Sequence, residues 1–309
     1  MDLNGKLVAV TGATGFLGSH IALTLLSRNM RARAVVRSVK KAQWLIERGV
    51  EVACADLHDV DSLCRGFAGC EAVVANAAFL ARKGGNLDEF VAGNVGGTEN
   101  LMIAALRAGV RRVVYISSVA VYKTSLFADM DEETPQHREL RRPLDLSGLI
   151  TNWRYAVTKA RGEQVAWRMA EEHNIDLTVL RPGPIYGERD QALTARYQRA
   201  MTRSVQLVPT IKVPHVHGAD VAAAVAGALA NDESVGRAYN VTGEPVSPWR
   251  VLRKWKQLRS SRTLLLPLFL PVGAKYDDSA AKRDLGFKPR SIERGLEGLL
   301  LPENPDAPL

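Results

Sequence analysis

Leu7-Val8-Ala9-Val10-Thr11-Gly12-Ala13-Thr14-Gly15-Phe16-Leu17-Gly18 starts with an apolar run that is typical of a strand buried on both faces. Glycines follow at a three-residue spacing, and Ile21, Leu25 and Leu26 then recur at the spacing of one helix face. The stretch therefore predicts a strand, a tight turn and a helix.

The three glycines indicate how this turn would hold a phosphate. Gly12 can adopt backbone angles that are closed to other residues. Gly15 has no side chain, so a pyrophosphate can approach the backbone, and Gly18 lets the helix pack close to the strand. The free N–H groups at the helix start then face the phosphates. The spacing is G-x-x-G-x-x-G rather than the standard G-x-G-x-x-G, so a turn that merely reverses the chain is the alternative.

Length and composition limit the classes of protein that the chain can represent. It has 309 residues, 46% of them hydrophobic, and a net charge of +8, which suits a full core with a second lobe and excludes disorder. No run of about 18 apolar residues occurs, and the first strand leaves no room for a signal peptide, so we expect a cytoplasmic protein. Cys54, Cys64 and Cys70 lack a metal-binding spacing, and we expect no metal. The basic residues are scattered, so nucleic acid is not an expected partner.

Short apolar strands alternate with helices along most of the chain. Further strands are expected at residues 33–36, 50–57, 72–78, 112–118 and 176–181, and helices at about 95–108 and 155–172. This alternation predicts an α/β fold with a doubly wound parallel sheet of the Rossmann type. We expect residues 1–181, with a returning segment at about 212–232, to form the dinucleotide-binding domain. A smaller α/β substrate lobe is expected from 182–211 and 233–309.

Residues after the second, third and fourth strands bear on the choice of cofactor. Arg37 ends the second strand and is followed by Lys40 and Lys41. Cations at this place favour the 2′-phosphate of NADP(H), whereas an acidic residue would favour NAD(H); a solvated basic loop is the alternative. Asp56 and Leu57 are placed to contact adenine, and the small residues around Ala75 and Ala77 let a cofactor lie close to the backbone.

Tyr155 and Lys159 are four residues apart on one predicted helix, so both side chains project from the same face. Ser117 and Ser118 end the fifth predicted strand. A free tyrosine has a pKa of about 10, and a nearby lysine cation favours the phenolate, so we expect Lys159 to lower the pKa of Tyr155. An ordinary pair on a helix face is the alternative.

Several motifs occur in an order that resembles a known family. They are Thr11-Gly12-Ala13-Thr14-Gly15-Phe16-Leu17-Gly18, Asp56-Leu57, Asn94-Val95-Gly96-Gly97-Thr98, Ser117-Ser118, Tyr155-x-x-x-Lys159, Arg181-Pro182-Gly183 and Asp284-Leu285-Gly286-Phe287-Lys288-Pro289. The set covers nearly the whole chain and resembles the extended short-chain dehydrogenases/reductases, the NAD-dependent epimerase/dehydratase family. Within that branch it is most similar to 3β-hydroxysteroid dehydrogenase-like and dihydroflavonol reductase-like members.

The resemblance implies roles for individual residues. Tyr155 would be the general acid in reduction, Lys159 would also hold the nicotinamide ribose, and Ser118 would orient the substrate carbonyl. A homodimer is implied as well. The predicted cofactor contacts are Gly12, Thr14, Gly15, Phe16, Leu17, Arg37, Lys41, Asp56, Leu57, Ala75, Ala77, Asn94, Ser117, Tyr155, Lys159, Pro182 and Ile185.

Departures from the family pattern guide the functional hypothesis. Pro184 stands where nucleotide-sugar enzymes commonly carry an asparagine, and it offers neither a side-chain amide nor a backbone N–H. The leading hypothesis is therefore an NADP(H)-dependent oxidoreductase that interconverts a hydroxyl and a carbonyl on a hydrophobic, steroid-like, polycyclic or aryl small molecule. A nucleotide-sugar epimerase or dehydratase is the alternative, and a non-catalytic NADPH-binding protein is a third. His215 and His217 are expected to be structural.

A basic segment near the C-terminus suggests a further partner. Arg250, Arg253, Lys254, Lys256, Arg259 and Arg262 alternate with Trp249, Val251, Leu252, Trp255 and Leu258. A lobe helix with a solvated basic face is the favoured interpretation. The alternative is a weak peripheral contact with an anionic membrane surface.

Overall fold

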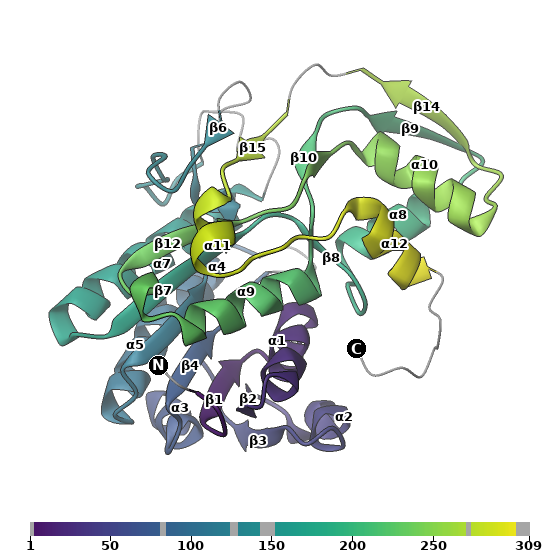
Figure 1. Ribbon diagram of the computed structural model, residues 1–309. Coiled ribbons are helices and arrows are strands. Elements are labelled where there is room, and N and C mark those ends of the chain that lie inside the picture. Colours follow the sequence, from purple (N-terminus) through teal and green to yellow (C-terminus); the bar gives the residue numbers. More distant parts are fainter. Residues whose placement is uncertain (1–2, 81–84, 124–128, 143–151, 270–272, 301–309) are drawn as a thin grey trace.

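The computed structural model describes residues 3–80, 85–123, 129–142, 152–269 and 273–300. Its centre is a seven-stranded parallel sheet with the order β12-β7-β5-β4-β1-β2-β3 (Figure 1). The strands are β1 Leu7–Thr11, β2 Arg31–Val36, β3 Glu51–Cys54, β4 Ala72–Ala75, β5 Arg112–Ile116, β7 Asp176–Pro182 and β12 Arg237–Val241. The strand order reverses at β1, between β4 and β2, and in doubly wound sheets ligands bind at such a point. The predicted fold class is confirmed.

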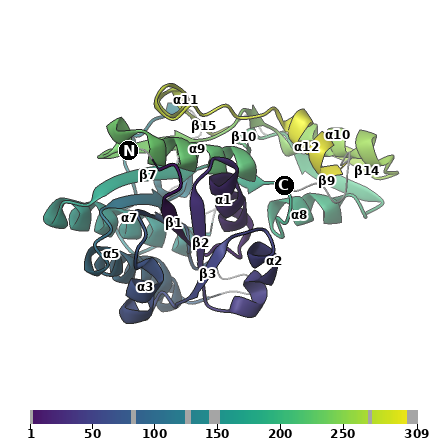
Figure 2. The ribbon, with the colours of Figure 1, turned by 60° about the horizontal axis from the view of Figure 1, so that its bottom comes forward.

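Helices cover both faces of this sheet (Figure 2). Successive residues of β1 alternate between the two faces, so Val8 and Val10 belong to one core and Leu7 and Ala9 to the other. The first core is closed by α1 Phe16–Ser27, α2 Gln43–Ile46 and α9 Gly218–Ala230. The second is closed by α3 Val60–Phe67, α5 Gly97–Arg107 and α7 Trp153–His173. Single turns of helix occur at η1 Val39–Ala42, η3 Val119–Val121 and η4 Asp232–Ser234.

Three features of the main body differ from the expectation. Residues 237–241 were assigned to the smaller lobe, but β12 pairs in parallel with β7, with Arg237 opposite Thr178. Short α11 (Ser279–Asp284) packs against β12 and α9, so it also belongs to the main body. The helix expected from residue 95 starts earlier, as α4 Leu87–Val91 and a π-helical turn, η2 Ala92–Gly96, that lead into α5. Asn86 and Glu89 form a capping box that fixes this earlier start.

The smaller lobe is built from short elements around its own core. They are β8 Ile185–Tyr186, α8 Leu193–Ala200, β9 Val205–Pro209, β10 Val213–Pro214, β11 Val216–His217, β13 Pro245–Val246, α10 Pro248–Arg259, β14 Leu264–Leu268 and α12 Ile292–Leu300. β9 and β14 form a two-stranded parallel sheet at the outer edge of the lobe (Figure 1). β15 Lys275–Tyr276 returns to the main body and pairs with β6 Asp129–Met130. None of the described helices is long and apolar enough to span a bilayer.

Candidate active site

The turn between β1 and α1 has the shape that its glycines predict. Gly12 has a φ of +66°, and a Cβ on it would lie 3.1 Å from the Cα of Ala77. A Cβ on Gly15 would lie 3.1 Å from the Gly12 carbonyl oxygen, and one on Gly18 would collide with the same oxygen. The first turn of α1 carries no acidic residue. The backbone there is therefore open to an anionic group, as a dinucleotide pyrophosphate requires.

Hydrogen bonds hold the ends of β1 and β4 together beside this turn. The Thr11 hydroxyl oxygen accepts from the backbone N–H groups of Asn76 and Ala77, each at 3.0 Å. The Asn76 side-chain amide donates to the Thr11 carbonyl at 3.2 Å. Ala75 is buried and Ala77 lies against Gly12, so small side chains line the strand-order reversal.

The residues predicted to hold the adenosine end lie after β2 and β3. Arg37 and Lys41 are exposed, and neither forms an ion pair within the described part of the chain. The Asp56 carboxylate accepts from the backbone N–H of His58 at 2.9 Å, and the Leu57 carbonyl accepts from the Asn100 amide at 2.8 Å. The two cations are thus free to bind an anion, while the Asp56–Leu57 segment is fixed by its own contacts.

Asn94 positions two segments and has little left to offer a cofactor. It is buried in the π-helical turn η2. Its side-chain oxygen accepts from the Phe79 N–H at 2.7 Å, and its amide donates to the Phe79 carbonyl at 3.2 Å and to the Thr158 hydroxyl at 3.1 Å. The side chain therefore ties the loop after β4 to α7, which carries Tyr155 and Lys159.

Tyr155, Lys159 and Ser118 meet where β5 ends against α7. Lys159 is 2% exposed, and its ammonium group donates to the Ile116 carbonyl at 2.7 Å and to the Tyr115 hydroxyl at 3.1 Å. The same group lies 4.4 Å from the centre of the Tyr115 ring, a cation–π contact. The Ser118 side chain lies close enough to the Tyr155 hydroxyl to act on its pKa. The residues chosen from sequence are brought together, and Tyr115 is an additional contact that sequence reasoning missed.

The environment shifts the pKa values of this pair in opposite directions. Burial raises the pKa of Tyr155 above its ordinary value, although the charge of Lys159 and the hydrogen bond from Ser118 both act to lower it. Burial lowers the pKa of Lys159, against the opposing effects of Tyr155 and Glu163. The expectation of a lowered Tyr155 pKa was therefore wrong in its net direction, because desolvation outweighs the lysine. The phenol stays protonated at neutral pH.

Glu163, one turn beyond Lys159, is a buried anion that the sequence analysis did not select. It is 0% exposed and accepts from the Ser117 hydroxyl at 2.5 Å, from Arg181 at 2.6 Å and from the Gln136 amide at 2.9 Å. The Ser117 side chain is thus turned to Glu163 rather than left free for a cofactor. The i, i+4 spacing of Lys159 and Glu163 was the available signal.

The remaining predicted positions lie on the lobe side of the sheet. Pro182 is buried at the end of β7, opposite Val241, and Ile185 is half-buried in β8. The only hydrogen-bonding group of Pro184 is its backbone carbonyl, which accepts from the Val216 N–H at 3.1 Å.

The two histidines have structural contacts. His215 lies 2.7 Å from the Tyr197 hydroxyl and 2.8 Å from the Val213 carbonyl, and burial lowers its pKa to about 4. The Nδ1 atom of His217 accepts from the Ala219 N–H at 3.2 Å, so Nε2 carries the proton and faces the Glu188 carboxylate at 3.3 Å. Both rings are buried and contact neighbouring protein groups, as expected of structural residues.

A glycine turn at a strand-order reversal thus lies beside Ser118, which follows β5, and Tyr155 and Lys159 of α7, an arrangement that suits an NAD(P)-dependent oxidoreductase acting on CH–OH or C=O groups. The family model described as "NAD dependent epimerase/dehydratase family" matches residues 8–242. The chain belongs to this family, as its motifs predicted.

Proteins similar to this chain agree with this class. Cinnamoyl-CoA reductase 1 of Petunia hybrida is 30% identical over 249 residues, which cover 76% of this chain and 72% of that protein. Dihydroflavonol 4-reductase of Dianthus caryophyllus is 30% identical over 196 residues, which cover 59% of this chain and 53% of that protein. The crystal structure of gox2253 matches with a TM-score of 0.79 and 26% identity, covering 95% of this chain and 96% of that one.

Proposed function

We propose that this protein is an NADP(H)-dependent reductase that interconverts a carbonyl and a hydroxyl on a small hydrophobic molecule. The observation that carries the proposal is the meeting of Ser118, Tyr155 and buried Lys159 at the carboxyl end of β5. The cofactor, when bound at the glycine turn, supplies or accepts a hydride. Its nicotinamide ribose would be held by Lys159, and its pyrophosphate by the start of α1.

The side chains account for the proton and for orientation. Ser118 donates a hydrogen bond to the substrate oxygen and fixes the carbonyl beside Tyr155. Tyr155 gives its phenolic proton to that oxygen as negative charge develops there. The ammonium group of Lys159 stabilises the phenolate that remains, and Ile116 and Tyr115 keep this cation in place.

Two kinds of support favour an aryl or polycyclic substrate. The relatives are named as reductases of cinnamoyl-CoA and dihydroflavonol, both of which are aryl compounds. Pro184 removes the amide that nucleotide-sugar enzymes of the family commonly use. The test is an assay of the protein with a panel of aryl and polycyclic aldehydes and ketones. For the compounds that it accepts, we expect NADPH consumption to be stoichiometric with the carbonyl reduced.

A nucleotide-sugar epimerase or dehydratase is the second candidate, because the family description includes both activities. Such an enzyme would regenerate its cofactor in every cycle. UDP- and dTDP-sugars are expected to bind poorly in calorimetric titrations. Micromolar binding of one of them, with an epimerised or dehydrated product and no net NADPH consumption, would replace the reductase proposal.

Arg37→Ala is expected to weaken NADPH binding and to leave NADH binding nearly unchanged. The exposed guanidinium follows β2 and lacks an ion-pair partner within the described residues, so it can pair with the 2′-phosphate. Losing one charge-assisted hydrogen bond costs about 1.5–3 kcal/mol. Calorimetric titration of both cofactors measures the effect. Arg28→Ala is the matched control, because Arg28 is exposed at the opposite end of α1. Equal dissociation constants of the unmodified protein for NADPH and NADH would refute the cofactor assignment.

A further inference from the structure

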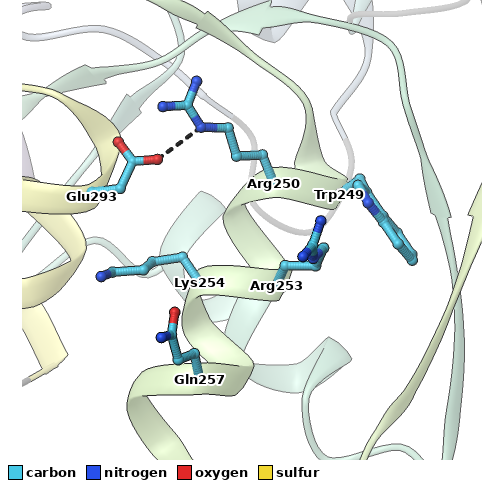
Figure 3. Close-up of a pocket in the computed structure, with 6 residues that line it drawn as sticks. All are labelled: Trp249, Arg250, Arg253, Lys254, Gln257 and Glu293. Atoms are coloured by element: carbon cyan, nitrogen blue, oxygen red, sulfur yellow. Dashed lines mark hydrogen bonds and ion pairs between the residues drawn. The ribbon is translucent and has the colours of Figure 1, made fainter.

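Helix α10 packs as the lobe helix that its sequence favours, rather than as a helix that faces a membrane. Its apolar side, with Val251, Leu252 and Trp255, is buried in the lobe core. Arg250 pairs with Glu293 of α12 at 2.7 Å (Figure 3). Lys254 pairs with Glu297 of the same helix at 2.6 Å. The helix therefore cannot insert its own apolar face into a membrane.

An exposed apolar surface lies beside this helix instead, on β9 and β14. Val205 is 52% exposed, Leu207 53%, Leu264 53%, Leu266 43% and Leu268 42%. The register places Val205 next to Leu264 and Leu207 next to Leu266, so these side chains form one continuous surface. The intervening residues Leu265 and Val208 point inward to the core of the lobe. Phe269, which is 79% exposed, extends the surface at the end of β14. We call these six outward residues the leucine face.

The two segments that build this part of the lobe carry only positive charge. Residues 191–219 and 245–276 contain eleven lysines and arginines and no aspartate or glutamate. Arg203 and Arg262 lie two residues before β9 and β14, and Arg259 ends α10. The backbone bond from Leu264 to Ser204 brings the two strand starts together, so these arginines gather at one end of the leucine face. Within the described residues none of the three has an ion-pair partner.

We propose that the leucine face docks onto an anionic lipid bilayer, with Arg203, Arg259 and Arg262 on the lipid phosphates. Exposed leucine and phenylalanine side chains gain free energy by entering the boundary between headgroups and acyl chains. Unpaired arginines beside them gain from the negative surface potential. A second copy of the chain would bring two cationic rims together, and a nucleic acid backbone would leave the leucines exposed. The bilayer satisfies both the apolar and the charged part of the surface.

Co-sedimentation with vesicles tests this docking. The full chain is expected to pellet with vesicles that contain phosphatidylserine, to pellet far less with pure phosphatidylcholine, and to be released by salt, because exposed charges are screened. Arg259→Glu/Arg262→Glu should weaken partitioning by more than about tenfold. The control variant Arg28→Glu/Arg111→Glu changes the net charge by the same amount, at exposed positions outside the lobe. It should weaken vesicle partitioning much less.

The apolar part of the surface is tested separately. Leu207→Glu/Leu266→Glu should abolish pelleting, whereas Leu106→Glu, at an exposed position on α5, should not. All of these substitutions are at exposed positions. Melting temperatures equal to that of the unmodified protein would show that the variants fold. The proposal is overturned if the Leu207→Glu/Leu266→Glu variant partitions onto vesicles as strongly as the unmodified protein. It is also overturned if the unmodified protein binds neutral and anionic vesicles equally. A different result would assign the leucine face to a second copy of the chain instead. In that case the unmodified chain forms a concentration-dependent dimer and does not bind vesicles, and Leu207→Glu/Leu266→Glu loses the dimer.

Discussion

Tyr155→Phe is expected to reduce turnover by about 10²–10⁴-fold, the usual contribution of a positioned general acid. The change removes one hydroxyl and little volume, and the helix α7 that carries Tyr155 is held by contacts of other residues. Folding and NADPH binding should therefore persist. Tyr239→Phe is the matched control, since it removes a hydroxyl that bonds Asp284 and lies outside the site. A Tyr155→Phe variant with full turnover would remove this residue from the mechanism.

The pH dependence of the unmodified enzyme follows from the raised pKa of Tyr155. Only the protonated phenol can donate, and a pKa above its ordinary value of about 10 keeps it protonated through neutral pH. Reduction should therefore show no loss from this group up to about pH 9, and oxidation, which needs the phenolate, should become faster as pH rises. A pH–rate series in both directions, with chemistry rate-limiting, measures this. A fall of the reductive rate near pH 7 that disappears in Tyr155→Phe would contradict it.

Glu163→Gln is expected to lower the free energy of unfolding by about 3–5 kcal/mol. The carboxylate is 0% exposed and is the ion-pair partner of Arg181, which is itself 4% exposed. Arg181 also donates to the Tyr122 hydroxyl at 2.7 Å and to the Glu132 carbonyl at 2.8 Å, so it cannot leave its buried position without breaking these bonds. The variant therefore leaves an uncompensated charge in the interior.

Denaturant unfolding measures this loss, and the same helix offers a control. Glu172→Gln removes a carboxylate from an exposed i, i+4 pair with Arg168, and such pairs contribute less than about 1 kcal/mol. Equal stabilities of the two variants would show that Glu163 and Arg181 do not form the buried pair described.

The fold was predictable because its main signals are local. The apolar run before Gly12, the three glycines and the following helix period all agree with one strand–turn–helix unit, and later strands repeat the pattern. β12 was missed because its short sequence, Arg237–Val241, mixes polar and apolar residues. Its place beside β7 is fixed by contacts between distant segments.

The candidate site was predictable only in part. The spacing of Tyr155 and Lys159 places both on one helix face, and the structure brings them to Ser118. The net pKa shift of Tyr155 was not accessible, because it depends on how far burial outweighs the nearby charge. The side chains of Asn94 and Ser117 point to protein partners rather than outward, and no sequence pattern reports that choice.

We expect Tyr155 and a bound NADPH to act together on a substrate carbonyl. The most direct test is a reaction with NADPH that carries deuterium at both C4 positions of the nicotinamide, on an aryl or polycyclic carbonyl that the enzyme accepts, followed by mass spectrometry of the alcohol. One deuterium on the carbinol carbon for each NADPH consumed, with a rate that falls by about 10²–10⁴-fold in Tyr155→Phe, is the predicted result. An alcohol without deuterium, or deuterium transfer at an undiminished rate in Tyr155→Phe, would contradict it.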